Sequence, residues 1–462
     1  MYGKKVSKHL QSICLFALIF SFMVITPQTI AYADTYGSKN TGIKYNILAK
    51  DEYNNWEGVS NVSQFLDSDG NFCFAYYNKK TVTVVKTKNG KPQKKKTTLQ
   101  MEYPIFGGVT CDSNGNYYLV CGRANTSDDQ TRETVFISKY DKNGTLLKTI
   151  GDNGNSSLDY WYPDDYNTKT PFSGGNCDIA INGDYLVVNY ARNMYSGHQS
   201  NSVFVINTNT MTRADAGNIY ESHSFAQRAI PYNNGFVFAS EGDCYDRAFT
   251  VSAVTDLSSA TNITGNTFHF WVKKGTLDRW DMSALNNNFA HMGDLVTIDH
   301  NSVALIASSA KSLNKKAASE TEQLFIQIFD PTKDLRTPSA YVTSGTRSGY
   351  SGPNGDKKVT DYGVKWLTSH SKKCTIKYPQ AVSDGNGSTI ILYELYKNSS
   401  YDGIYYLVVD QNGTVTIKRT KYSSTAHLNP CETPVFSGKT VYWTGNSTKN
   451  NTMYVYSLKI GK

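Results

Sequence analysis

A hairpin unit that recurs along the chain constrains the fold more than any other feature of the sequence. Each unit has an apolar strand, a short polar turn, a second and strongly apolar strand, and one or two further strands; the clearest copy spans 106–150. The turns at 67–71, 112–116, 141–145, 384–388 and 410–414 all read Asp-x-x-Gly, typical of hairpins. About seven such units predict an all-β chain folded as a β-propeller of about seven four-stranded blades.

The composition and the chain ends agree with this prediction. Tyr, Val, Thr, Gly and Asn are abundant, and the residue runs that form amphipathic helices are scarce. The alternating residues Ile43, Tyr45 and Ile47 precede the first unit, so an N-terminal strand can complete the last blade and close the ring. We expect an N-terminal segment at 34–60 and a single propeller domain at 61–462, with long inter-blade insertions at 255–288 and 336–374.

The N-terminus indicates secretion. Lys4, Lys5 and Lys8 precede a short apolar run, and Ala31 and Ala33 follow it in an A-x-A arrangement. This order is typical of a signal peptide, predicted here over 1–33. The apolar run is shorter than the roughly 20 residues that a transmembrane helix needs, which favours cleavage over an uncleaved anchor. We therefore expect a secreted, extracellular chain without a transmembrane segment. If the chain is retained at the cell surface, we expect the attachment to be non-covalent.

The charge of the chain argues against some classes of partner. Without the signal peptide the formal charge decreases from +8 to +5, and much of the excess lies in the lysine-rich segment 86–96 around an Asn-Gly turn. This segment is either a solvated hairpin tip or a site that attracts anionic wall polymers. Because its basic residues are not interleaved with aromatic ones, we expect no nucleic acid partner.

The cysteines do not suggest a disulfide scaffold or a metal centre. Seven remain beyond the signal peptide, no Cys-x-x-Cys pair occurs, and an odd number leaves at least one free thiol or an intermolecular bridge. Cys111, Cys177 and Cys431 fall on predicted innermost strands, where small side chains suit tight packing. The sequence therefore predicts no metal site and identifies no cofactor.

Two neighbouring segments carry polar residues where the pattern otherwise indicates buried sheet. They are SHSFAQR at 222–228 and EGDCYDR at 241–247. In a regular strand Ser224 and Arg228 share one face and His223 and Gln227 the other. If both segments belong to one blade, their polar residues meet near one end of the central channel, where propeller ligands usually bind. The candidate ligand-binding residues are His198, His223, Gln227, Asp243, Tyr245 and Arg247.

Three roles stay open for this group: a structural hydrogen-bond network between blades, a binding site, or catalysis. His223 and Ser224 face apart, so they do not form a simple base and nucleophile pair, and no Gly-x-Ser-x-Gly elbow is present. Glu241 and Asp243 could pair as in a glycosidase, although alternate residues of a strand are more often structural. Buried Asp and Arg must pair to be tolerated, which explains their presence without catalysis.

Several segments of the chain resemble a family of secreted, β-propeller-like repeat proteins of Gram-positive bacteria. In that family a His-Ser-Phe-x-Gln segment precedes a Gly-Asp-x-Tyr-x-Arg segment, as 223–227 and 242–247 do here, and the similarity extends over most of the chain beyond the signal peptide. The resemblance implies the propeller fold and an extracellular setting, and it brings no known activity.

These observations together predict a secreted propeller scaffold. We expect it to present a binding surface at the channel mouth for an extracellular glycan, such as a cell-wall glycan, or an extracellular protein. The alternative is a hydrolase or lyase that acts on a polysaccharide or peptide at the same mouth, because the fold hosts binding proteins and enzymes alike.

Overall fold

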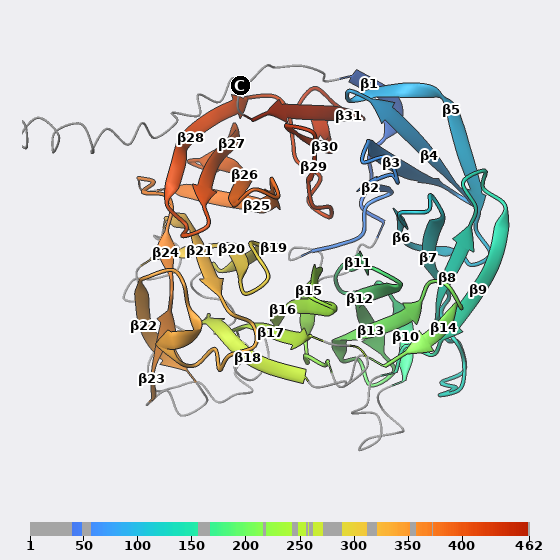
Figure 1. Cartoon of the computed structure of the whole chain (residues 1–462), viewed down its shortest axis with the longest axis horizontal. Helices are drawn as coiled ribbons and strands as arrows, with labels where there is room; N and C mark the ends of the chain where they lie inside the picture. Colours follow the sequence, from blue (N-terminus) through green and yellow to red (C-terminus); the bar gives the residue numbers. More distant parts are fainter. Residues whose placement is uncertain are drawn as a thin grey trace, which may run out of the picture.

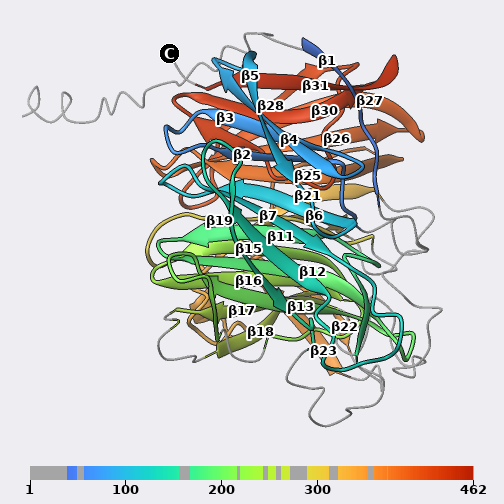
Figure 2. The same ribbon diagram turned by 90° about the vertical axis from the view of Figure 1, so that its right-hand side faces the viewer.

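Seven antiparallel sheets are arranged in a ring around one axis, as Figure 1 shows. The computed structural model describes residues 39–48, 57–155, 167–215, 219–242, 248–255, 257, 262–270, 289–311, 321–351, 357–371 and 373–460. The sheets follow one another along the chain, so that each blade packs on the preceding and following ones (Figures 1 and 2). The predicted seven-bladed propeller is confirmed. The predicted signal peptide at 1–33 lies outside the described residues.

The first three blades come from the N-terminal part of the chain. The first contains β2 (Val62–Leu66), β3 (Phe72–Asn78), β4 (Thr81–Lys88) and β5 (Lys91–Gln100). The second contains β6 (Ile105–Cys111), β7 (Tyr117–Gly122), β8 (Val135–Tyr140) and β9 (Leu146–Asp152). The third contains β11 (Cys177–Asn182), β12 (Tyr185–Met194), β13 (Gln199–Asn207) and β14 (Thr212–Ala214), and β10 (Thr168–Pro171) also pairs with β12.

The fourth and fifth blades include the two predicted insertions. The fourth contains β15 (Ser224–Tyr232), β16 (Gly235–Gly242), β17 (Ala248–Val254) and β18 (Asn262–His269). The fifth contains β19 (His291–Thr297), β20 (Val303–Ala310), β21 (Glu322–Phe329) and β24 (Lys365–Trp366). Between β21 and β24 lie a 3-10 helix, η4 (Pro338–Ala340), and a hairpin of β22 (Thr346–Ser351) and β23 (Lys357–Tyr362). The stretches expected to be inter-blade insertions therefore each contain the outermost strand of a blade. The polar sequence of β18, NITGNTFH, has no apolar pattern from which a strand could be predicted.

The last two blades close the ring. The sixth contains β25 (Cys374–Ser383), β26 (Ser388–Lys397), β27 (Ser400–Asp410) and β28 (Val415–Ser423). The seventh contains β29 (Val435–Ser437), β30 (Thr440–Ser447), β31 (Asn450–Lys459) and, as its outermost strand, β1 (Lys39–Lys44). Because β1 pairs antiparallel with β31, the two ends of the chain share one sheet, and the predicted ring closure is confirmed.

The hairpin turns form as their sequences predict. In the turn after β2, the Asp67 carboxylate accepts hydrogen bonds from the backbone N–H groups of Asp69 (3.0 Å) and Asn71 (2.9 Å), and Gly70 adopts φ 72°. Asp112, Asp141, Asp384 and Asp410 accept the same pair of bonds in their own turns. The carboxylates of these loops are thus used for turn formation.

The lysine-rich segment is the hairpin between β4 and β5. Asn89 and Gly90 form its turn with φ of 51° and 70°, as the Asn-Gly pair predicts. β5 is the outermost strand of the first blade, and Lys94, Lys95 and Lys96 are exposed on it. Lysines on an exposed edge strand also discourage edge-to-edge association of sheets.

The apolar core lies between neighbouring blades. One cluster joins the fifth and sixth blades through residues such as Ile306 and Ile391, and another joins the seventh and first through residues such as Val455 and Phe72. Packing of this kind leaves the innermost strands to line the channel. Among the described residues no helix is long and apolar enough to span a membrane.

Candidate functional site

Polar side chains occupy one corresponding position in most of the innermost strands. Hydrogen bonds define this position, because Ser63, Asp178, Asp294 and Glu432 each accept a bond from the backbone N–H group that follows the corresponding residue of the next blade. The Asp178 carboxylate accepts from Ala229 N (2.6 Å), and the Asp294 carboxylate accepts from Ala381 N (2.7 Å). The residues at this position, which we call the channel ring, are Ser63, Gly108, Asp178, Arg228, Asp294, Gln380 and Glu432.

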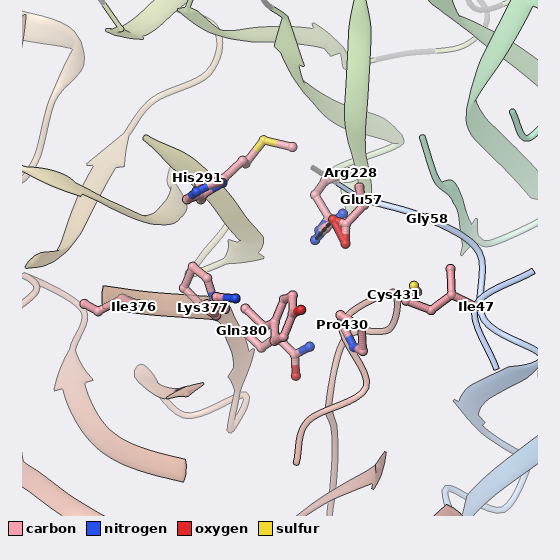
Figure 3. Close-up of a pocket in the computed structure, with 13 residues that line it drawn as sticks. Ile47, Glu57, Gly58, Arg228, His291, Ile376, Lys377, Gln380, Pro430 and Cys431 are labelled. Carbon is pink, nitrogen blue, oxygen red and sulfur yellow. Dashed lines mark hydrogen bonds and ion pairs between the residues drawn. The ribbon is translucent and has the colours of Figure 1, made fainter. Parts of the chain in front are cut away.

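Arg228 is the only cation of the channel ring, and two carboxylates hold it. Its Nε donates to Asp294 Oδ1 at 2.8 Å, and its Nη2 lies 3.4 Å from Glu57 Oε2. Glu57 belongs to the segment before β2, which enters the centre of the ring, and Figure 3 shows its carboxylate facing Arg228. Arg228 is only 8% exposed, so this pairing is what makes its burial tolerable.

The channel holds more carboxyl groups than the charge of Arg228 can balance, and burial raises the pKa values of several of them. Burial raises the pKa of Glu57 to about 7, although Arg228 opposes the shift. Burial likewise raises the pKa of Asp178 to about 6 and that of Glu432 well above its ordinary value. Near neutral pH the Glu57 carboxyl group is therefore partly protonated.

We expect Glu57→Gln to flatten the pH dependence of stability. The pKa of Glu57 in the folded protein lies above its ordinary value of 4.5, so its stabilising contribution is complete below that value and is lost as the pH rises through about 7. As the pH rises from 5 to 8, the titration of Glu57 should lower the free energy of unfolding of the wild type by roughly 2–3 kcal/mol. Urea unfolding at several pH values measures the slope; equal slopes in the two proteins would contradict the assignment.

Two cavities lie along the channel, and Arg228 and Cys431 line both. The first, which we call the mouth cavity, has a volume of about 170 Å³ and is lined by Glu57, Lys377, Tyr378 and Gln380 among others. The second, of about 260 Å³, is lined by Asp178, Glu432 and the strands around them. The ion pairs of Arg228 thus lie between two hollow parts of the channel.

The wall of the mouth cavity contributed by β25 is irregular. A register shift between Lys377 and Gln380 marks a β-bulge, and Tyr378 within it adopts a left-handed φ of 52°. The Tyr378 side chain is 38% exposed. A bulky residue with positive φ is uncommon, and bulges often re-aim side chains beside binding sites. The bulge thus places an accessible aromatic ring at the mouth of the channel.

Gln380 has an unused acceptor in this wall. Its Nε2 donates to the Asn429 carbonyl oxygen at 2.6 Å, but Oε1 is buried without a hydrogen-bond partner, and the residue is 3% exposed. Figure 3 shows Gln380 on the cavity wall below Arg228 and Glu57. A buried polar atom without a partner is costly, so a donor from a bound ligand would stabilise Oε1 once the Gln380 amide turns toward the cavity.

The structure brings together part of the group predicted from the sequence. β15 is an innermost strand and pairs with β16 from Ser224 opposite Gly242, so the first segment meets the described start of the second, Glu241 and Gly242, in one blade. His198, between β12 and β13, lies beside His223 with ring centroids 5.4 Å apart. Asp243, Tyr245 and Arg247 lie outside the described residues.

The predicted division of faces at Gln227 is wrong. A bulge between Ser224 and Ala226 breaks the strict alternation, and Gln227 Nε2 donates to Ser224 Oγ at 2.6 Å. Gln227 is fully buried, and its backbone bonds to Asn176. Glu241 accepts a hydrogen bond from Met292 N at 2.8 Å, which gives this carboxylate a structural bond to the next blade.

Sequence reasoning missed most of the residues of the mouth cavity. Glu57, Lys377, Tyr378 and Gln380 were not selected, and Arg228 was noted only as part of its segment. The available signal was the polar residue that recurs at one position in most of the innermost strands, as in CDIA, QRAI, GDLV and PQAV.

The described cysteines are Cys73, Cys111, Cys121, Cys177, Cys374 and Cys431, and all six are free thiols. Burial raises the pKa of Cys73, Cys111 and Cys121 to about 12, so these thiols are protonated and unreactive at neutral pH. Within the part of the chain that the structure describes, no cluster of three His, Cys, Asp or Glu residues is arranged to hold a metal ion.

Comparison with solved structures gives remote similarities that span most of the chain. The N-terminal domain of Nup159 is 10% identical with a TM-score of 0.40, covering 92% of this chain and 98% of that one. The RRP9 WD40 repeats are 9% identical with a TM-score of 0.43, covering 92% and 100%. Trypanosoma rangeli sialidase is 11% identical with a TM-score of 0.40, covering 82% and 59%. No family model and no curated protein matches the chain. Similarities this remote assign no function to the chain.

Proposed function

We propose that the protein is a secreted, non-catalytic propeller that binds an extracellular glycan in the mouth cavity. The observation that carries the proposal is that Gln380, whose buried Oε1 lacks a partner, lines a cavity next to an exposed tyrosine. Sugars supply what this wall lacks, because their hydroxyl groups donate hydrogen bonds and their apolar ring faces stack on aromatic rings. Secretion itself rests on the predicted signal peptide at 1–33.

The size of the cavity limits how much of a glycan it holds. Ligand pockets for whole small molecules usually measure about 300–1,000 Å³, whereas the mouth cavity measures about 170 Å³. It therefore takes one ring or chain end, and the rest of the glycan lies over the face of the propeller. His223 precedes the innermost strand β15 and His198 precedes β13, the third strand of its blade, at this same end of the blades, and we propose both as contacts for the outer part of the ligand.

A glycan array and isolated wall fractions test the proposal, with Gln380→Leu as the informative variant. We expect the wild type to bind a defined set of glycans and the variant to bind them about 5- to 150-fold more weakly, since a lost hydrogen bond to a buried group costs about 1–3 kcal/mol. Gln327→Leu is the matched control, because Gln327 also has a buried Oε1 without a partner but lies outside the mouth cavity. Equal loss in both variants, or none in either, would contradict the assignment of the site.

Glu57 favours a second candidate function, a hydrolase or lyase that acts at the same mouth. Its pKa of about 7 suits a general acid near neutral pH. An enzyme would release new reducing ends or unsaturated products from a polysaccharide, and Glu57→Gln would abolish this release. Our proposal predicts binding without such products.

A further inference from the structure

Lys377 is a cation of the mouth cavity that has no carboxylate partner among the described residues. Its side chain is exposed, and its Nζ lies 4.8 Å from the centroid of the Tyr396 ring. The ion pairs of the described residues include Arg228 with Glu57 and Asp294 but none with Lys377. A face-on contact with an aromatic ring positions an ammonium group without neutralising it.

The ionisable groups near Lys377 leave its charge unbalanced. Burial, followed by the positive charge of Lys377, lowers the pKa of His291 to about 4, so this imidazole is neutral. Glu322 lies close enough to interact with Lys377, but burial raises its pKa to about 8, and its carboxyl group is largely protonated at neutral pH. Arg228 is already balanced by its two carboxylates. Among the described residues that line the mouth cavity, Lys377 is therefore the cation without an ion pair.

We infer that the glycan bound in the mouth cavity carries an anionic group, a uronate carboxylate or a phosphate, which pairs with Lys377. This inference rests on the proposed function and adds the chemical class of the ligand. Three groups on one short segment of β25 then act together: Tyr378 stacks on the ring, Gln380 Oε1 accepts from a hydroxyl group, and Lys377 binds the anion. The bulge between Lys377 and Gln380 is what brings these three side chains to one cavity.

Two pairs of probes test the class of ligand by calorimetry or fluorescence titration. The first pair is a galacturonic acid trisaccharide and its carboxyl-reduced counterpart, and the second is galactose 6-phosphate and galactose. We expect the charged member of at least one pair to bind about tenfold more tightly, which corresponds to about 1.4 kcal/mol; the pair that discriminates identifies carboxylate or phosphate. Equal binding within both pairs, or no binding of any probe, would overturn the inference, while the glycan screen decides the proposed function separately.

Variants assign the discrimination to Lys377. Lys377→Met keeps the apolar part of the side chain and should lower the affinity for the charged probe to that for its neutral counterpart. Lys377→Arg should retain the preference for the charged probe. Lys94→Met, on the exposed strand β5, is the control for a general effect of positive charge and should leave the preference intact. A preference that persists in Lys377→Met or disappears in Lys94→Met would also overturn the inference.

Discussion

Replacing Arg228 with methionine is expected to lower the free energy of unfolding by about 3–5 kcal/mol, because it leaves buried carboxylates without a counter-charge. Glu57 and Asp294 both bind the guanidinium group, and Asp178 lies near enough to feel its charge. Each of these carboxyl groups is held at the channel by the fold, so the protein cannot simply expose them to water. Urea unfolding of the variant and the wild type at pH 8 measures this decrease in the free energy of unfolding.

The pH dependence of this variant separates charge from packing. The pKa values of Glu57 and Asp178 are already raised in the folded protein, so both groups take up protons as the pH falls toward 5. The loss caused by Arg228→Met should therefore be smaller at pH 5 than at pH 8. Adding Glu57→Gln to the variant should restore part of the stability. A loss below about 1 kcal/mol at pH 8, or one independent of pH, would contradict the role assigned to Arg228.

Removing β1 is the second change with a large expected effect. A chain that starts at Asn46 lacks the outermost strand of the seventh blade and the Tyr45 side chain, which is buried and donates to Asn429 Oδ1 at 2.9 Å. Removing a buried aromatic side chain alone costs about 3–5 kcal/mol. We therefore expect a loss of at least about 4 kcal/mol in the free energy of unfolding, measured by urea titration. Because β31 becomes an exposed edge, concentration-dependent association should also appear in sedimentation.

A chain that starts at Lys39 is the matched control, since it keeps β1 and lacks only the residues before it. It should match the chain that starts at Asp34 in stability and association. Tyr45→Phe isolates the hydrogen bond to Asn429 and should cost about 1 kcal/mol. If the chain starting at Asn46 were as stable as the control, β1 would not close the ring.

The fold was predictable because its signals are local. Asp-x-x-Gly turns between apolar runs define hairpins of the first, second and sixth blades within about 20 residues each, and the alternating segment that begins at Ile43 indicated the closing strand. The outermost strands β18 and β24 were missed because they are polar or very short, so that no apolar pattern marks them.

The site was less predictable because its residues come from distant parts of the chain. Glu57 and Arg228 are 171 positions apart, and nothing near either residue indicates that they meet. The strict alternation of a strand also failed at Gln227 and at Tyr378, where bulges turn the side chains. Bulges depend on how neighbouring blades pack, and this information is absent from a short stretch of sequence.

The most direct test of the account is a crystal structure of the protein with the glycan that binds most tightly in the screen. The account predicts a sugar ring against Tyr378 in the mouth cavity, with a hydroxyl group donating to Gln380 Oε1. A glycan bound along the lysines of β5, with the mouth cavity unchanged, would contradict it and assign binding to the basic hairpin instead.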